Sequence, residues 1–287
     1  MTFPLPTNID STDHAGIGED DHEAHHDSVH RYINMANATW VDSTDDAVTL
    51  QAKIDAGPVI LMEDVSIDTS IDLDRDDISI ELNGHTLIYT GTGSVFYLNG
   101  NNGRIGNGII NPSGSQNVFS VASATSASGW RFHDLSVSTA GSCVVVVGTL
   151  LRSLFESFEF TAEATGVPVV DITNATAFKE NVFHRGRFFQ PASSTVPIVR
   201  ISCVAGAVNN NEWSNCRLDT SGSPTSPCIL VECTSAGWHY GNVFKHLNFS
   251  APTQGAIALY SCFGSVINEV RISDVITALG HLIYIGK

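Results

Sequence analysis

The sequence predicts an all-β fold, a right-handed parallel β-helix solenoid of about eight coils with a short α-helical N-terminal region. First, the 287 residues include 24 glycines but only 15% charged residues, which is typical of many strands joined by tight turns. Second, a pair of large apolar residues, five positions apart, recurs every 23 to 31 residues, about the length of one solenoid coil. Third, another strand pattern recurs in step with these pairs.

The apolar pairs predict one strand in every coil. A solenoid repeat can bury its apolar face only against neighbouring repeats, so regular recurrence indicates stacking. The pairs are Leu82/Leu87, Ile105/Ile110, Phe132/Val137, Phe155/Phe160, Phe183/Phe188, Trp213/Leu218, Phe244/Phe249 and Val270/Val275.

The second pattern predicts at least one further strand per coil. Its runs are short, rich in Val, Ile and aromatic residues, and bounded by Gly, Asn, Ser or Pro, as strands usually are. They occupy residues 94–99, 117–122, 143–148, 168–173, 197–202, 228–233, 256–261 and 281–286.

Three kinds of residue recur at the same spacing and predict vertical columns. Stacked asparagine amides can hydrogen-bond along the solenoid at the turn, and the cysteines are interpreted as small buried apolar residues. The expected columns are Pro168, Pro197 and Pro227, then Cys203, Cys233 and Cys262, and then Asn181, Asn211, Asn242 and Asn268.

Residues 41–90 are predicted to form a module that covers one end of the solenoid, ahead of coils that span 91–287. Asp45 and Asp46 are acidic N-cap candidates for an amphipathic helix. Strands are expected at 59–62 and 78–82, followed by a tight turn at Asn83 and Gly84. The helix is indicated by Ala47, Leu50, Gln51 and Ile54.

The sequence DDAVTLQAKIDAG, which starts at Asp45, resembles the first module of pectate-lyase-like β-helix proteins. There, a helix with this pattern leads into a short apolar strand and a coil that ends in Asn-Gly. The resemblance implies the parallel β-helix fold. It leaves the activity open, because phage tail spikes and pectinolytic enzymes share this module.

Residues 1–40 are predicted to be a virion-attachment and trimerisation segment. A second helix is expected over 18–40, with Asp20 and Glu23 spaced as a capping box. Residues 18–40 resemble the N-terminal helices of phage minor tail proteins and tail fibres. The resemblance implies a homotrimer that is joined to other tail or baseplate proteins. The i, i+4 spacing of His22, His26 and His30 would suit a metal site, whereas the alternative is a polar helix at a subunit interface or facing solvent.

The bulk charge and hydropathy limit the partners. The formal net charge of −16 disfavours binding to nucleic-acid phosphates. No apolar stretch reaches the roughly 20 residues that cross a bilayer, and the first residues do not resemble a secretory signal. We therefore expect no nucleic acid, no membrane insertion and no cofactor.

One flank of the solenoid is predicted to carry a candidate active site. Hydrolysis of a polysaccharide uses two carboxyl groups roughly 5 to 10 Å apart, and adjacent coils lie about 4.8 Å apart. Catalytic carboxylates are expected at Asp134, Glu156 and Glu159, with ligand-binding residues at His184, Arg185 and Arg187. The alternative is a charge ladder that pairs Glu156 with His184 and Glu159 with Arg187.

An aromatic turn offers a second contact with sugars. Trp238, His239 and Tyr240 are expected in a turn, where their rings would stack on a glycan. The alternative is that Trp238 folds back over the solenoid. Pectate-lyase chemistry implies calcium held by several Asp residues beside an Arg base, and no such set is visible.

The favoured function is a viral tail-spike or tail-fibre protein that binds a host cell-surface polysaccharide. Its location would be the virion tail, where it would act outside the host cell. Two alternatives stay open: a glycan-degrading spike, either a hydrolase or less readily a lyase, and a free extracellular polysaccharidase, for which an export signal would be expected. Whether any bond is cleaved is left undecided.

Overall fold

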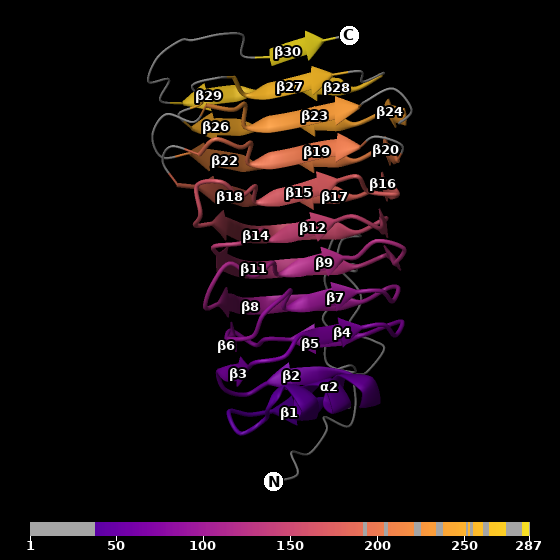
Figure 1. The fold of residues 1–287 in the computed structure, drawn as a ribbon, viewed down its shortest axis with the longest axis vertical. Coiled ribbons are helices and arrows are strands. Elements are labelled where there is room, and N and C mark those ends of the chain that lie inside the picture. The colour runs from indigo at the N-terminus through magenta and orange to yellow at the C-terminus, as the bar shows by residue number, and fades with distance from the viewer. Residues whose placement is uncertain are drawn as a thin grey trace, which may run out of the picture. The chain divides into compact units, whose positions relative to one another are not determined.

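A computed structural model describes residues 38–191, 194–203, 206–220, 225–233, 238–250, 252, 255–260, 264–273 and 283–286. The described residues from Thr39 onward belong to one compact unit. It is a parallel β-solenoid of about seven turns, with 53% strand and 5% helix (Figure 1). The solenoid prediction is confirmed, although the turns number about seven rather than eight. The helix expected over 18–40 falls outside the described residues up to residue 37, and its last two positions belong to strand β1 (Thr39–Val41) instead.

Helix α2 (Ala47–Ala56) is the only helix in the part of the chain that the structure describes. The Asp46 carboxylate accepts a hydrogen bond from the Thr49 N–H at 2.8 Å, which satisfies one of the amides that a helix start leaves without a partner. Ala47, Leu50 and Ile54 form its buried face. The predicted helix is therefore confirmed, and it lies beside β1 and β2 at the start of the stack (Figure 1).

Gln51 of α2 joins the cap to the first strand of a sheet. Its side-chain nitrogen donates to the Asp72 carbonyl at 2.9 Å, and its side-chain oxygen accepts from the Asp72 N–H at 2.8 Å. Asp72 belongs to β4 (Ile71–Leu73), at the end of its sheet. The helix thus satisfies backbone groups that an open sheet edge would expose.

The strands form three sheets, and every described pairing between them is parallel. Sheet A contains the strands of the apolar pairs. Its members are β1 (Thr39–Val41), β2 (Val59–Leu61), β3 (Val65–Ile67), β5 (Ser79–Glu81), β6 (Thr86–Tyr89), β8 (Arg104–Pro112), β11 (Arg131–Thr139), β14 (Leu154–Ala162), β17 (Val182–His184), β18 (Arg187–Gln190), β21 (Glu212–Ser214), β22 (Arg217–Thr220), β25 (Val243–Lys245), β26 (Asn248–Ser250), β28 (Val266–Asn268) and β29 (Arg271–Ser273).

Sheet B contains the strands of the second sequence pattern, as predicted. It consists of β4, β7 (Phe96–Leu98), β9 (Phe119–Val121), β12 (Val144–Val146), β15 (Val170–Thr173), β19 (Val199–Cys203), β23 (Ile229–Cys233), β27 (Ile257–Tyr260) and β30 (Ile283–Gly286). Sheet C was not predicted. It consists of β10 (Ser126–Ser128), β13 (Thr149–Leu151), β16 (Ala177–Lys179), β20 (Ala207–Asn209) and β24 (Trp238–Tyr240).

The six inner apolar pairs stack in the predicted register, and so does Leu87 of the first pair, which lies beside Ile110. Leu82 and the last pair do not continue the columns. At the start, Ile80 rather than Leu82 lies beside Ile105. At the end, Ile267 and Ile272 rather than Val270 and Val275 continue the columns. The last described coil of sheet A is shorter than the sequence pattern assumed, and this shifts the residues of β28 and β29.

The interior of the solenoid holds a stack of aromatic rings. The centroids of successive rings are 4.5, 4.4, 5.7 and 5.0 Å apart, and neighbouring planes differ by 14° or less. The stack is continuous over five coils and fully buried. Its members, in order, are Phe132, Phe155, Phe183, Trp213 and Phe244.

The asparagine column is confirmed for three of its four members. The Asn211 amide donates to Asn242 at 3.0 Å and accepts from Asn181 at 3.1 Å, and all three side chains are buried. Asn268 does not belong, because it lies beside Lys245 in sheet A.

The cysteine column is confirmed for Cys203 and Cys233, whereas Cys262 lies outside the described residues. Cys143, Cys203, Cys216 and Cys228 are buried free thiols, and burial raises the pKa of Cys216 and of Cys228 to about 12. Among the described residues, no helix is long and apolar enough to cross a membrane.

Candidate functional site

A column of left-handed residues runs along sheet A, one in each coil. A positive φ is uncommon outside glycine, and polar residues such as Asn, Asp and His tolerate it best. These residues have φ between 49° and 60° and, except for half-buried Ser157, are exposed. We call them the corner column: Asn107, Asp134, Ser157, Arg185, Asn215, His246 and Glu269.

Each residue of the corner column lies either within a long strand of sheet A or between two short ones. A further column of side chains therefore lies on each side of the corner column. Glu156 lies beside His184 in one, and Glu159 lies beside Arg187 in the other. The flank predicted to carry a site therefore exists, and all six predicted residues lie on it. Because of the shift in the last coil, Arg271 lies beside Asn248 in the column that contains Glu159 and Arg187.

The candidate catalytic carboxylates Glu156 and Glu159 are both engaged in ion pairs. Glu156 is 3.3 Å from the Arg131 guanidinium, and Glu159 is 3.1 Å from that of Arg187. The pair of Glu159 with Arg187 is the one expected from a charge ladder, whereas Glu156 lies beside His184 in the register but pairs with Arg131 instead. A catalytic role for these carboxylates stays a prediction.

The remaining predicted flank residues differ in their surroundings. Asp134 and Arg185 belong to the corner column and are exposed. His184 is half-buried, and its Nδ1 lies 2.9 Å from the Ser214 hydroxyl. The exposed pair is therefore accessible to a large ligand, whereas His184 is held against the sheet.

His133, which was not predicted as a site residue, connects Asp134 to the sheet. Arg104 Nε donates to His133 Nε2 at 2.8 Å, so the ring proton is on Nδ1, which donates to Asp134 at 3.1 Å. Burial lowers the pKa of His133, against a smaller opposing effect of its hydrogen bond to Asp134. Gly106 makes room for the ring, because a Cβ there would collide with it.

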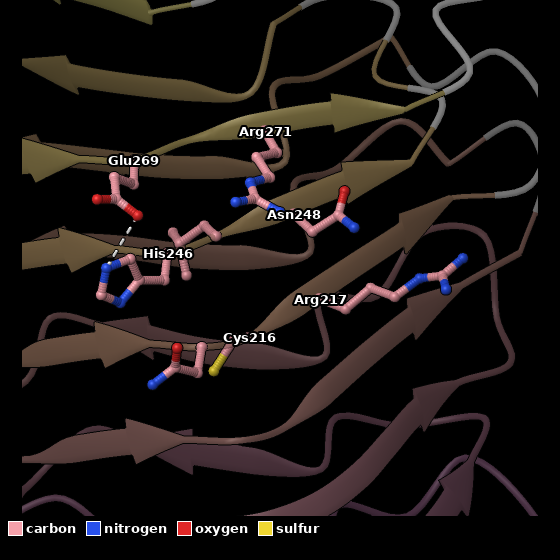
Figure 2. Close-up of a pocket in the computed structure, with 8 residues that line it drawn as sticks. Cys216, Arg217, His246, Asn248, Glu269 and Arg271 are labelled. Atoms are coloured by element: carbon pink, nitrogen blue, oxygen red, sulfur yellow. Dashed lines mark ion pairs between the residues drawn. The ribbon is translucent and has the colours of Figure 1, made fainter.

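Further along the corner column, the surface is hollowed (Figure 2). The hollow has a volume of about 450 Å³, within the usual range of roughly 300 to 1,000 Å³ for small-molecule sites. Sequence reasoning missed it because it took Val270 and Val275 as the last apolar pair, and this register does not place Arg271 beside Asn248. The lining residues are Asn215, Cys216, Arg217, His246, Leu247, Asn248, Glu269 and Arg271.

The charged groups around the hollow differ in whether they form ion pairs with described residues. Arg217 donates to buried Asp219 at 2.6 Å, and Asp219 also accepts from Arg187 at 2.7 Å. His246 Nε2 lies 3.1 Å from the Glu269 carboxylate, as the dashed line in Figure 2 marks. Arg271 is exposed and forms no ion pair with any residue in the described part of the chain.

The predicted aromatic turn is a strand instead. Residues 238–240 form β24 of sheet C, where successive side chains point to opposite faces. His239 is fully buried, so the expectation that its ring meets a ligand at the surface was wrong. Tyr240 is 45% exposed and stays a candidate for sugar contact. The side chain of Trp238 lies outside what the structure describes.

Buried His239 is expected to make the solenoid sensitive to acid. Neither ring nitrogen has a hydrogen-bond partner among the described residues, and burial lowers the pKa of His239 from the ordinary 6.5 to about 4. The unfolded chain therefore binds this proton first, and stability falls as pH drops from 6.5 towards 4. Linkage gives a loss of up to roughly 3 kcal/mol.

The measurement is the urea midpoint of the wild type and of His239→Leu between pH 7 and pH 4. The variant should lose less stability on acidification than the wild type does. His85→Leu is the matched control, because the His85 side chain is 33% exposed. Parallel pH curves for the wild type and His239→Leu would contradict the assignment.

Within the described ranges, no group of three or more His, Cys, Asp or Glu residues could hold a metal ion. The predicted metal residues His22, His26 and His30 lie outside these ranges. A metal site there stays a prediction.

No protein-family model matches the chain, and no curated protein matches it either. Its class is therefore defined by the fold, a parallel β-solenoid. The distinguishing surface of this solenoid is the corner column with its hollow.

Proposed function

We propose that the chain is the receptor-binding part of a viral tail spike or tail fibre, and that it binds a cell-surface polysaccharide along the corner column. The observation that supports this most is the line of exposed polar side chains from Asn107 to Glu269. Such side chains repeat about every 4.8 Å on a rigid sheet. A polysaccharide likewise presents hydroxyls at regular intervals along a line.

The first module is compatible with the viral setting, because tail spikes share it with pectinolytic enzymes, and the resemblance of residues 18–40 to phage tail proteins favours the tail spike. The Asp45–Gly57 motif that resembles the first module of tail-spike β-helices folds as a helix that covers the first coils. We propose a homotrimer joined through residues 1–40 to other tail or baseplate proteins. The chain would then act outside the host cell, on the virion tail.

The test compares two triple-glycine variants of the full chain. Glycine removes a side chain and still accepts a positive φ, so the backbone is preserved. Asp134→Gly, Arg185→Gly and Asn215→Gly strip the corner column. The control is Asn102→Gly, Glu180→Gly and Asn210→Gly, which strips exposed left-handed residues outside the corner column.

Binding is measured on a panel of immobilised cell-surface polysaccharides, both neutral and acidic. The wild type and the control should bind the same polysaccharide, and the corner-column variant should bind it at least tenfold more weakly. Equal binding by all three proteins would remove the corner column as the binding surface. Failure of the wild type to bind any polysaccharide would refute the proposed function.

A glycan-degrading spike is the second candidate. Glu156 and Glu159 lie on one strand, β14, on either side of half-buried Ser157 in the corner column. A bound polysaccharide would therefore pass both carboxylates, and hydrolysis uses two carboxyl groups. Release of reducing ends from the bound polysaccharide, abolished in Glu156→Gln or Glu159→Gln, would favour this function over binding alone.

A further inference from the structure

We propose that the hollow at Arg271 binds the acidic group of a charged sugar, such as the carboxylate of a uronic acid, and so gives the solenoid a preference for acidic polysaccharides. This inference rests on the proposed function and names its ligand class. The site consists of an apolar floor, a cationic rim and a polar rim.

The floor of the hollow is uncharged. Cys216 and Leu247 are buried, with 2% and 0% of their surface exposed. The Cys216 thiol donates weakly to backbone carbonyls of Phe183 and Ser214 at 3.4 and 3.3 Å. Burial keeps this thiol neutral by raising its pKa to about 12. The floor therefore carries no charge that would repel an acidic group, and the exposed rims supply the contacts to a ligand.

The cationic rim supplies the charge. Arg217 and Arg187 share the buried carboxylate of Asp219, so their charge is partly neutralised and their orientation is held. Arg271 has no such partner among the described residues. It lies beside Asn248 in the register, and Asn248 lies beside Arg217. A guanidinium binds a carboxylate or a sulfate through two parallel hydrogen bonds.

The polar rim on the other side suits hydroxyl groups. His246 and Glu269 belong to the corner column and pair with each other at 3.1 Å. Figure 2 shows this pair to the left of Arg271 and Asn248. A carboxylate oxygen accepts hydrogen bonds from sugar hydroxyls, and Glu269 is 59% exposed and accessible.

The negative net charge of the whole chain limits where an acidic polysaccharide can bind. The chain has a formal net charge of −16, so its surface as a whole repels an acidic polymer. An acidic polysaccharide is therefore expected to attach at exposed cations without an ion pair to a described residue, and of these Arg271 also lines a hollow. Arg271 supplies such a point in the upper coils, and the neutral stretches of the corner column can follow the rest of the polymer.

The experiment measures binding of small probes to the full chain by calorimetry or NMR titration. The probes are glucuronate, glucose as its neutral counterpart, and inorganic sulfate as a free anion. The proteins are the wild type, Arg271→Gln and the control Arg75→Gln. Arg75 is also exposed and without an ion pair to a described residue, and it lies between β4 and β5, far from the hollow.

We expect glucuronate to bind the wild type and Arg75→Gln alike and to bind Arg271→Gln at least tenfold more weakly, with glucose below detection. Absent glucuronate binding, or equal binding to Arg271→Gln, would overturn the inference. Sulfate binding as tight as that of glucuronate would also overturn it, because the site would then recognise an anion and not a sugar. The polysaccharide panel tests the proposed function separately, since it includes neutral polymers that do not need Arg271.

Discussion

Replacing Asn211 by alanine is expected to lower the free energy of unfolding by roughly 3 to 5 kcal/mol. The Asn211 amide donates to the Phe178 carbonyl at 2.8 Å and accepts from the Asn181 backbone N–H at 3.0 Å. Without the side chain, both backbone groups stay buried and lose a partner. Water cannot easily replace the amide, because Asn181, Asn211 and Asn242 are 0%, 0% and 1% exposed.

Urea unfolding of the full chain, followed by circular dichroism, measures the loss. Asn99→Ala is the matched control, because Asn99 is exposed and an exposed substitution usually changes stability by less than about 0.5 kcal/mol. Similar losses in both variants would show that the asparagine ladder contributes nothing specific. Solenoids can unfold coil by coil, so the steepness of the transition should also fall for Asn211→Ala.

Replacing Phe183 by alanine is expected to cost roughly 3 to 5 kcal/mol, through lost burial and a cavity in the aromatic stack. The Phe183 ring is parallel to within 2° to both neighbours, with centroids 4.4 Å from Phe155 and 5.7 Å from Trp213. The neighbouring coils contribute rings to the same stack. These rings cannot move in to fill the cavity without losing contacts with their other neighbours.

The measurement is again the urea midpoint, with two comparisons. Phe183→Leu keeps most of the volume and should cost much less than Phe183→Ala. Ile109→Ala removes a side chain of β8 that is 41% exposed and should change little. A cost for Phe183→Ala below about 1 kcal/mol would mean that the stack is not a main source of stability.

The inner register could be predicted from the sequence because a one-residue slip in a strand would turn its apolar side chains out of the core. Phe132, Phe155 and Phe183 therefore had only one arrangement that buried them all. The outer coils could not be predicted in this way. Several apolar residues near 80 and 270 satisfy the same pattern, and only the length of the turns decides between Val270 and Ile267.

Sheet C shows the limit of periodicity. Its strands are three residues long, which is too short for an alternating pattern to stand out from a turn. Residues 238–240 were accordingly predicted as a turn, and His239 was placed at the surface. The positions of Glu156, Glu159 and Arg187 on the flank were predicted correctly, because the inner register of sheet A fixes them.

The sequence by itself determined the repeat, the capping helix, the two main sheets and the asparagine ladder, because each is encoded by residues at regular or local spacing. The tertiary structure alone decided the corner column, the hollow and the burial of His239. These depend on backbone conformation at the turns and on side chains from coils that lie about 30 residues apart in the sequence. Arg271 belongs to the site only because the last coil is short enough to bring it beside Asn248.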